Sequence, residues 1–233
     1  HNSGKKSSKS LRTPKFGNQV GAKIDNNFVT LSSFSNEIIS SNLEELLNFN
    51  NKKLRVVELG GGYGQFAYHL LKKRKNFLYI DFDIPEVLCL ASYYLIKTFP
   101  QKKTLLYGEK NFSIKKSKNY NFIFLPYFEI SKLKKNSVDL FINMCSLSEM
   151  EKTSVHQYFK YINNASKYIF HMNHDINRNK FSKNKTSYLA HEYPISKKFI
   201  LKSKYLDIFH FMNFNGNIDF DKDIFAYLYE NSK

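Results

Sequence analysis

One stretch near the end of the first quarter of the chain constrains the fold most: an apolar run that ends in a cluster of glycines. Residues 54–59 read Leu-Arg-Val-Val-Glu-Leu, and four glycines follow within residues 60–64. Apolar residues then recur with the i, i+3, i+4, i+7, i+8 spacing of one buried helix face; they are Tyr63, Phe66, Ala67, Leu70 and Leu71. The sequence therefore predicts a strand, a tight turn and a helix, a unit whose exposed backbone N–H groups bind nucleotide-like ligands.

Strands and helices are predicted in alternation along most of the chain. Further helices are expected at residues 85–98 and after Ser148, and strands at residues 77–80, 122–125, 138–143, 168–170, 198–212 and 223–229, with a strand fragment within 101–120. Such alternation implies a mostly parallel sheet, and the last two strands, joined by residues 213–217, imply one antiparallel strand. We predict an α/β, Rossmann-like fold with a seven-stranded mostly parallel sheet, an antiparallel C-terminal strand and helices on both faces.

The first 50 residues are predicted to form a basic, partly disordered N-terminal arm that ends in a helix. Residues 1–34 show little periodicity, and their first half carries basic residues among serines without an acidic residue, which favours disorder; these are Lys5, Lys6, Lys9, Arg12 and Lys15. Residues 35–50 show a helical pattern with Ile39, Leu43, Leu46 and Leu47 on one face. We assign residues 51–233 to one further domain.

The overall charge is strongly positive. Lysine and arginine number 36 against 20 acidic residues, a formal net charge of +16 in 233 residues. Such a charge suggests a nucleic-acid or membrane partner, but the lysines are scattered among asparagines, so we do not expect nucleic acid. No run of 18 apolar residues predicts a membrane span, and Cys89 and Cys145 lie in apolar contexts typical of reduced, structural cysteines. We expect a cytoplasmic protein.

Two templates compete for the glycine loop. A dinucleotide site requires G-x-G-x-x-G; a match from Gly60 ends at Gln65, and a shifted match from Gly62 ends at Ala67. The other template, acidic-x-G-x-G-x-G, is matched at every position. Its residues are Glu58, Gly60, Gly62 and Gly64. We favour this second template; a turn that merely packs a helix on a strand is the structural alternative.

The second template suits S-adenosylmethionine, which has no pyrophosphate. A carboxylate at the strand end, here Glu58, can meet the cationic end of that molecule through water or backbone, while glycines let the main chain approach closely. The ribose hydroxyls require a second acidic residue at the end of the next strand. Asp83 stands near that position, and Asp81 lies on the same side of an extended chain.

Three segments carry a resemblance to a known family: residues 57–64, residues 79–88 with Tyr93-Tyr-Leu95, and residues 143–150. Together they resemble class I S-adenosylmethionine-dependent methyltransferases. More narrowly, they resemble bacterial proteins provisionally assigned as sugar O-methyltransferases of surface-polysaccharide synthesis. The resemblance covers roughly residues 54–175.

The resemblance implies a methyltransferase that uses S-adenosylmethionine and acts on a small-molecule sugar or nucleotide-sugar acceptor. It assigns the ribose contact to Asp83 by position. No metal site is predicted, and the cluster of His171, His174 and Asp175 is a weak metal signal that stays an alternative. The cofactor-binding residues that we expect are Glu58, Gly60, Gly61, Gly62, Gly64, Asp81, Asp83, Tyr127 and Asn143. The adenine contact departs from the family pattern, because Pro126-Tyr-Phe-Glu129 stands where an acidic residue is usual.

Methyl transfer to a sugar hydroxyl also requires a base, because such a hydroxyl is weakly acidic. The acceptor is expected beyond the fourth and fifth strands, where Glu149, His174 and Asp175 are the candidate catalytic residues. Glu149 equally suits the first turn of a helix, with Ser148 as N-cap and Glu151 completing a capping box. Further alternatives are acceptor-pocket roles for Tyr188, His191 and Glu192, and structural roles for His69, His156, His171 and His210.

Three alternatives remain open at the level of sequence. The positive charge and 38 aromatic residues suit an RNA methyltransferase, although residues 143–146 lack the Asn/Asp-Pro-Pro-Tyr element of base methylases. Another small-molecule methyltransferase is a second alternative. A cofactor-binding scaffold without catalysis is the third. The oligomeric state is not predicted.

Overall fold

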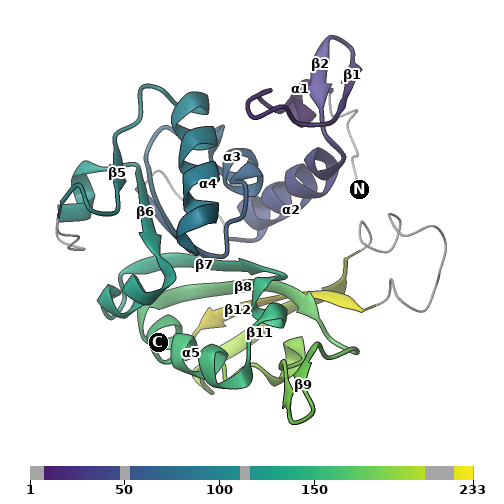
Figure 1. Cartoon of the computed structure of the whole chain (residues 1–233), viewed down its shortest axis with the longest axis vertical. Coiled ribbons are helices and arrows are strands. Elements are labelled where there is room, and N and C mark those ends of the chain that lie inside the picture. The colour runs from purple at the N-terminus through teal and green to yellow at the C-terminus, as the bar shows by residue number, and fades with distance from the viewer. Residues whose placement is uncertain (1–7, 48–52, 111–115, 208–222, 233) are drawn as a thin grey trace.

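A computed structural model of the chain describes residues 8–47, 53–110, 116–207 and 223–232. Its centre is an eight-stranded sheet with the order β11-β12-β8-β7-β3-β4-β6-β5 (Figure 1). The strands of this sheet are β3 (Leu54–Leu59), β4 (Phe77–Asp83), β5 (Thr104–Leu106), β6 (Phe122–Pro126), β7 (Val138–Met144), β8 (Ser166–His174), β11 (Phe199–Leu206) and β12 (Ile224–Asn231). The α/β class of the prediction is confirmed.

The strand directions are those expected from the sequence, but the strand count is not. Every neighbouring pair in the part of the sheet ordered β8-β7-β3-β4-β6-β5 is parallel, and β12 pairs antiparallel with both β8 and β11. The prediction of seven strands is wrong by one. The eighth strand is β5, three residues long, which corresponds to the strand fragment expected within residues 101–120 and pairs with β6 at the sheet edge. So short an edge strand leaves little periodic signal in a lysine-rich stretch.

Helices cover both faces of the sheet, as predicted (Figure 1). One face is covered by α2 (Leu31–Leu47), α3 (Gln65–Leu71) and α4 (Pro85–Thr98). The other is covered by α5 (Lys152–Ala165) and by two short 3₁₀ helices, η2 (Tyr127–Lys132) and η4 (Ala190–Glu192). Because strand side chains alternate between faces, Val56 packs in the first layer and Val57 in the second.

Two helix starts differ from the sequence prediction. Helix α2 begins at Leu31 rather than residue 35, and its Leu46 is 58% exposed, whereas the other apolar residues predicted for that face are buried. Ser148 is not the N-cap of α5: the chain first forms η3 (Ser146–Glu149), and Glu151 then takes the N-cap position without a side-chain cap. Ser148 is buried instead, with its hydroxyl on the Asn173 side chain.

Part of the predicted N-terminal arm forms regular structure. From Ser8 onward it forms α1 (Ser8–Leu11) and the hairpin β1 (Ala22–Ile24) and β2 (Asn27–Val29) above α2 (Figure 1). Thr13 is buried, and its backbone N–H donates to the Phe28 carbonyl at 2.8 Å. Packing therefore orders a segment whose composition favours disorder; Lys5 and Lys6 lie outside the described residues.

Three smaller elements complete the description: η1 (Lys116–Asn119) and the two-stranded β9 (Lys180–Ser182) and β10 (Lys185–Thr186). Within the described parts of the chain, no helix is both long and apolar enough to cross a membrane. The same residues contain no group of three or more His, Cys, Asp or Glu side chains arranged to hold a metal ion. Residues 213–217, predicted as the last turn, lie outside the described residues.

Candidate active site

A cavity of about 650 Å³ opens at the carboxyl ends of β3, β4 and β7. This is the edge of a parallel sheet at which α/β proteins bind ligands. Its lining comes from the glycine loop (Leu59, Gly60, Gly62), the end of β4 with the start of α4 (Phe82, Asp83, Ile84, Val87), the end of β7 with η3 (Met144, Cys145, Ser146, Glu149, Met150), and Tyr127, Glu151, Ser154 and Tyr158. Some of the predicted cofactor and acceptor residues therefore line this cavity, and the others do not.

The glycine loop requires glycine at its turning points. Gly60 and Gly62 have φ of 78° and 56°, in the left-handed region that L side chains rarely adopt. A Cβ on Gly60 would lie 2.2 Å from the Ser146 hydroxyl, so Gly60 is needed for close packing. A Cβ on Gly62 would meet no atom within 4 Å, because this position faces open space at the cavity. The loop therefore presents bare main chain to a ligand.

Two buried acids lie directly behind the loop. The Tyr79 hydroxyl donates to Glu58 at 2.6 Å, and burial raises the pKa of Glu58 to about 7. Asp81 is fully buried beside it and accepts the Gly61 N–H at 3.2 Å. Burial, with Glu58 next, raises the pKa of Asp81 well above its usual value, and its second oxygen has no hydrogen-bond partner. A buried acceptor without a donor is costly in a folded protein, which indicates a site that a ligand or water completes.

Asp83 is the acid at the rim of the cavity. One carboxylate oxygen accepts the Gly62 N–H at 3.1 Å, and the other accepts the Ile84 N–H at 2.7 Å. Burial raises the pKa of Asp83, although both backbone hydrogen bonds act in the opposite direction. Asp81 and Asp83 lie on the same side of β4, as predicted, and each holds one glycine of the loop.

The wall beyond Asp83 is apolar and aromatic. Ile84, Val87 and Tyr127 line it together with Tyr158 of α5. Ile84 is 47% exposed and Tyr127 is 40% exposed, so both offer free surface to a flat ligand. Such a surface suits a purine ring, which stacks on apolar and aromatic groups. Tyr127 was a predicted cofactor residue, whereas Tyr158 comes from the helix predicted after Ser148.

Asn143 lies behind the cavity rather than in its lining. The side chain is fully buried: its amide donates to the Leu59 carbonyl at 2.7 Å, and its oxygen accepts from Asn173 at 2.9 Å. The next residues, Met144 to Ser146, form the wall instead. Cys145, a free cysteine, has a φ of 66°, an unusual conformation for a non-glycine residue. Met144, Cys145 and Ser146 belong to the segment 143–150 that carries the family resemblance, but no role in the cavity was predicted for any of them.

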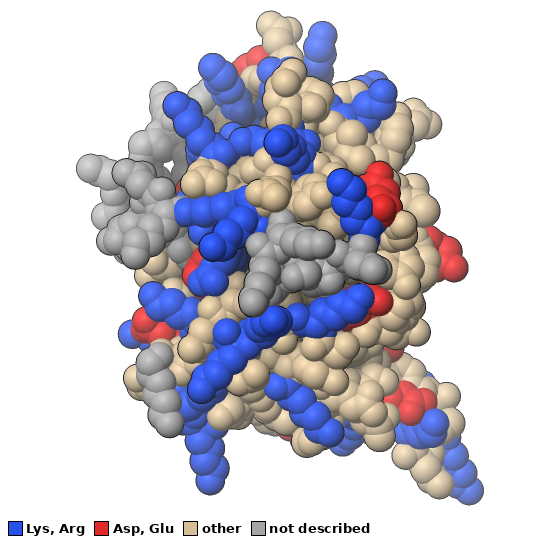
Figure 2. All heavy atoms as spheres, turned by 90° about the vertical axis from the view of Figure 1, so that its left-hand side faces the viewer, with Lys and Arg blue, Asp and Glu red and all other residues tan. Residues whose placement is uncertain are grey.

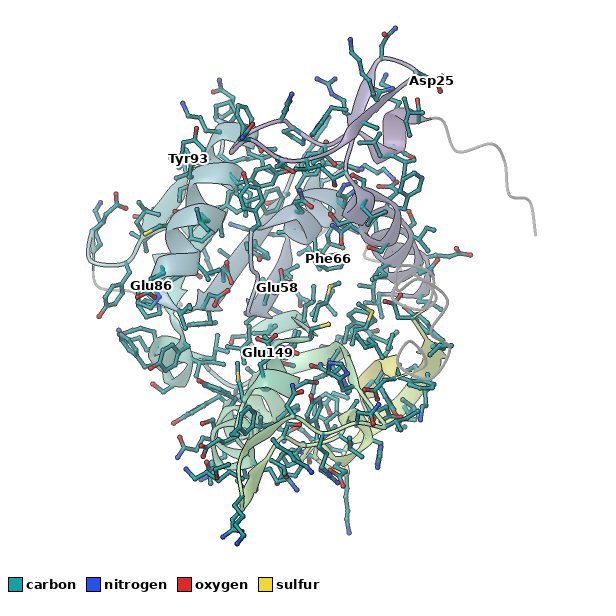
Figure 3. The ribbon with its side chains drawn as sticks, turned by 45° about the vertical axis from the view of Figure 1, so that its right-hand side comes forward. Asp25, Glu58, Phe66, Glu86, Tyr93 and Glu149 are labelled. Carbon is teal, nitrogen blue, oxygen red and sulfur yellow. The ribbon has the colours of Figure 1, made fainter. Side chains whose placement is uncertain are left out.

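The three candidate catalytic residues occupy different places. Glu149 is exposed and lines the cavity, and Figure 3 shows Glu58 and Glu149 one above the other near the centre of the molecule. His174 and Asp175, at the end of β8, are not among the lining residues. The His174 ring pairs with Asp223 at 2.7 Å. Sequence reasoning missed Asp223, which is 49 positions away along the chain.

Asp175 is the centre of a second buried network. Its carboxylate accepts from His191 at 2.8 Å, Lys204 at 3.0 Å and Tyr227 at 2.8 Å. Burial raises the pKa of Asp175, but the hydrogen bonds, led by the one from Lys204, outweigh burial and lower the pKa overall. With these donors in place, Asp175 is fully engaged within the protein.

The predicted structural histidines that are buried fit that role. His69 and His171 are 3% and 0% exposed, and burial lowers their pKa values to about 4 and about 3, so both rings are neutral near pH 7. His171 stacks on the Tyr227 ring at 4.9 Å. His210 lies outside the described residues. Glu192 forms an ion pair with Arg178 rather than facing the cavity.

Comparison with solved structures identifies the fold. A protein provisionally assigned as a sarcosine dimethylglycine methyltransferase from Galdieria sulphuraria superimposes with a TM-score of 0.59 and 11% identity, over 91% of this chain and 92% of that one. Magnesium protoporphyrin IX methyltransferase from Synechocystis, solved with bound S-adenosylmethionine, gives 0.54 and 12%, over 86% and 81%. The chain has a methyltransferase fold.

Within this fold the similarity is structural and not close in sequence. The mitomycin 7-O-methyltransferase gives a TM-score of 0.53 at 10% identity over 86% of this chain, which spans only 54% of that enzyme. No family model matches the sequence, and no curated protein does. The methyltransferase fold therefore stands on architecture, and the functional argument depends on the cavity itself.

Proposed function

We propose that this protein is an S-adenosylmethionine-dependent O-methyltransferase that acts on a hydroxyl of a sugar or sugar conjugate in surface-polysaccharide synthesis. The observation that carries the proposal is the contact of Asp83 with Gly62 at the rim of the cavity. A ribose placed there would meet a carboxylate acceptor and bare main chain together. The methyltransferase fold supports the same assignment.

The charges around the loop favour S-adenosylmethionine over a dinucleotide. Asp83 raises the pKa of Glu58, and Glu58 and Asp83 both raise the pKa of Asp81. A pyrophosphate would add two negative charges to this group, whereas an ammonium and a sulfonium would offset it. Asp81 also has a buried oxygen without a partner. The residues present therefore fit a ligand that is cationic at this end.

The remaining cofactor residues divide by chemistry. Gly60, Gly61, Gly62 and Gly64 would bring main chain close to the methionyl end, with Glu58 and Asp81 acting through water or backbone. Tyr127 and Ile84 offer the surface for adenine. Asn143 would act indirectly, by holding Leu59 and η3 in place. The bound cofactor would supply an electrophilic methyl group, and the chain would align and deprotonate the acceptor.

The sugar acceptor is supported by the resemblance at residues 143–150. Glu149 of this segment is exposed at the cavity, where a carboxylate can accept hydrogen bonds from sugar hydroxyls.

Figure 2 shows many lysine and arginine side chains on one side of the molecule. Lys103, Lys110 and Lys118, before and after β5 in the chain, are exposed. A nucleotide-sugar carries a diphosphate that such a surface attracts.

The same basic surface favours one second candidate, an RNA methyltransferase. Phosphate contacts by scattered lysines bind RNA without sequence preference. The two candidates share the cofactor and differ in acceptor. A scaffold without catalysis is distinguished by binding of the cofactor in the absence of turnover.

Calorimetric titration with S-adenosylmethionine and with its demethylated product tests the proposal first. We expect both to bind; absence of binding by either would refute the methyltransferase assignment. Incubation with cofactor labelled in the methyl group, against a panel of nucleotide sugars and a panel of RNAs, then decides the acceptor. Label transfer to RNA alone would replace the sugar assignment.

A further inference from the structure

A histidine–carboxylate pair lies at the carboxyl end of β8. The Nδ1 atom of His174 is 2.7 Å from Oδ2 of Asp223. Strand β12 runs antiparallel to β8 with Ile224 opposite His174, so the sheet brings the two residues together. Asp223 is 3% exposed, whereas the His174 side chain is 34% exposed. The carboxylate is thus inside and the imidazole reaches outward.

The second oxygen of Asp223 is held by main chain. Its Oδ1 atom accepts the N–H groups of Asp175, Ile176 and Asn177 at 3.1, 2.5 and 2.9 Å. A carboxylate that accepts from every side serves as an acceptor only, as an ionised carboxylate does. The His174 Nδ1 atom must then be the donor of the remaining hydrogen bond. Of the two neutral tautomers of His174, this hydrogen bond selects the one in which Nε2 carries a lone pair.

His174 lies at the same edge of the sheet as the cavity. Strand β8 is parallel to β7, and the pair Met144–Met172 marks where the cavity-lining end of β7 lies beside β8. The His174 backbone N–H donates to the Ser148 hydroxyl at 3.1 Å, and the next residue, Glu149, lines the cavity. Among the described residues, no side chain or carbonyl is hydrogen-bonded to Nε2 of His174. That atom is available to a substrate.

We propose that His174 is the general base for the acceptor hydroxyl and that Asp223 is its positioning residue. This inference rests on the proposed function and adds a residue that the sequence did not indicate. The alternatives are weaker on geometry. Asp175 is engaged by His191, Lys204 and Tyr227, and Glu149 has no described group that fixes its orientation. Glu149 then serves as a ligand of the acceptor.

The proton balance follows from the tautomer. The acceptor hydroxyl gives its proton to Nε2 of His174, and the oxygen uses its electron pair to form the new bond to the methyl carbon. The methyl donor keeps the pair of the broken carbon–sulfur bond and leaves as a neutral thioether. The imidazolium that forms faces the Asp223 carboxylate, which stabilises it. A positioned base of this kind contributes roughly 10²- to 10⁴-fold in rate.

The decisive variant is Asp223→Asn. Three main-chain N–H groups donate to Oδ1, so that position must stay an oxygen in the variant. The new amide would therefore turn its NH₂ toward Nδ1 of His174, which must then accept the hydrogen bond. The ring would carry its proton on Nε2, the wrong atom for a base, as in the equivalent substitution of a serine-protease triad. Nitrogen-15 NMR of the histidine rings reads this tautomer without cofactor or activity. We expect a protonated Nδ1 in the native protein and a protonated Nε2 in Asp223→Asn.

Kinetics separate positioning from a structural role. We expect kcat of Asp223→Asn to fall by about 100-fold, with the acceptor KM and the affinity for S-adenosylmethionine unchanged. Asp139→Asn is the matched control, because this carboxylate pairs with Arg55 at the opposite end of β7; it should change neither kcat nor the His174 tautomer. A native His174 protonated on Nε2, or an Asp223→Asn protein with normal kcat, would overturn the proposal.

A second variant serves if Asp223→Asn does not fold. His174→Ala should lose turnover and regain part of it in added imidazole, which can occupy the vacated space as an external base. Lack of rescue in a folded His174→Ala protein would overturn the role of His174. Failure of the proposed function looks different: no S-adenosylmethionine would bind to the native protein, while the NMR tautomer would still report the His174–Asp223 pair.

Discussion

Tyr79 donates a 2.6 Å hydrogen bond to Glu58 beneath the glycine loop, and both side chains are buried. Burial raises the pKa of Glu58 to about 7, the Tyr79 hydrogen bond acts against it, and Asp83 raises it further. The acid is therefore poised to ionise near neutral pH. Its charge state is linked both to stability and to a cationic ligand.

This linkage predicts a pH dependence of stability. A carboxyl whose folded pKa exceeds its unfolded value of 4.5 contributes stability that is present below pH 4.5 and lost as pH rises through about 7. The loss amounts to about 3 kcal/mol by pH 8. Glu58→Gln keeps the acceptor for Tyr79 and removes the titration. Urea unfolding at pH 5 and pH 8 should show a smaller decrease for Glu58→Gln than for the native protein. Exposed Glu45→Gln should leave the decrease unchanged.

Asp83 gives the sharpest test of the cofactor site. Asp83→Ala removes the carboxylate at the cavity rim, and we expect S-adenosylmethionine affinity to fall by at least about 100-fold, the loss of one or two charged hydrogen bonds. Glu86→Ala is the matched control, since Glu86 is an exposed acid three residues later, shown on the outer surface in Figure 3. Equal affinities of Asp83→Ala and Glu86→Ala in calorimetry would remove Asp83 from the site.

Gly62 and Gly108 allow a second matched comparison. Both have positive φ, 56° and 90°, and a Cβ on either would meet no atom within 4 Å. Each Gly→Ala change should cost about 1–2 kcal/mol of stability from backbone strain. Only Gly62→Ala places a methyl group at the cavity, so only this variant should weaken S-adenosylmethionine binding. Similar binding by the two variants would show that the loop does not contact the cofactor.

Glu149→Gln should spare the cofactor and slow the reaction. The amide retains hydrogen bonding but loses the charge that holds an acceptor hydroxyl, so we expect kcat/KM for the acceptor to fall by about 10-fold. Calorimetry should return the native affinity for S-adenosylmethionine. If Glu149→Gln turns over normally, the acceptor is held by other groups in the cavity wall.

Local patterns made part of this site predictable. The strand, the glycine turn and helix α3 follow from periodicity and from residues that are neighbours in sequence. Asp81 and Asp83 could be placed on one side because strand side chains alternate. The strand that carries them was predicted only as far as residue 80, although β4 continues to Asp83.

Residues that meet only through tertiary packing could not be found in this way. The cavity wall from Met144 to Ser146 depends on η3, a turn that replaces the expected capping box at Ser148. The His174–Asp223 pair depends on the antiparallel register of β12 with β8. Asn143 was predicted to contact the ligand because of its position at the end of a strand. In the fold its buried side chain instead forms hydrogen bonds with the Leu59 carbonyl and the Asn173 side chain.

Glu37 of α2 forms a buried contact with the α3 region, and this contact can be tested. The Glu37 side chain of α2 is 1% exposed and lies 2.6 Å from Lys72 and 3.1 Å from His69 of the α3 region. Burial raises the pKa of Glu37, but the hydrogen bonds from Lys72 and His69 outweigh it and lower the pKa overall. Its stability contribution is therefore present above the unfolded pKa of 4.5 and is lost as pH falls through the lower folded pKa.

Glu37→Ala leaves Lys72 and His69 without their carboxylate, and we expect about 3 kcal/mol of destabilisation at pH 7. Thermal unfolding at pH 7 and pH 3 should show this difference shrinking at the lower pH. Exposed Glu45→Ala, on the same helix, should change stability little at either pH, and an equal loss from both variants would show that the buried contacts of Glu37 contribute nothing.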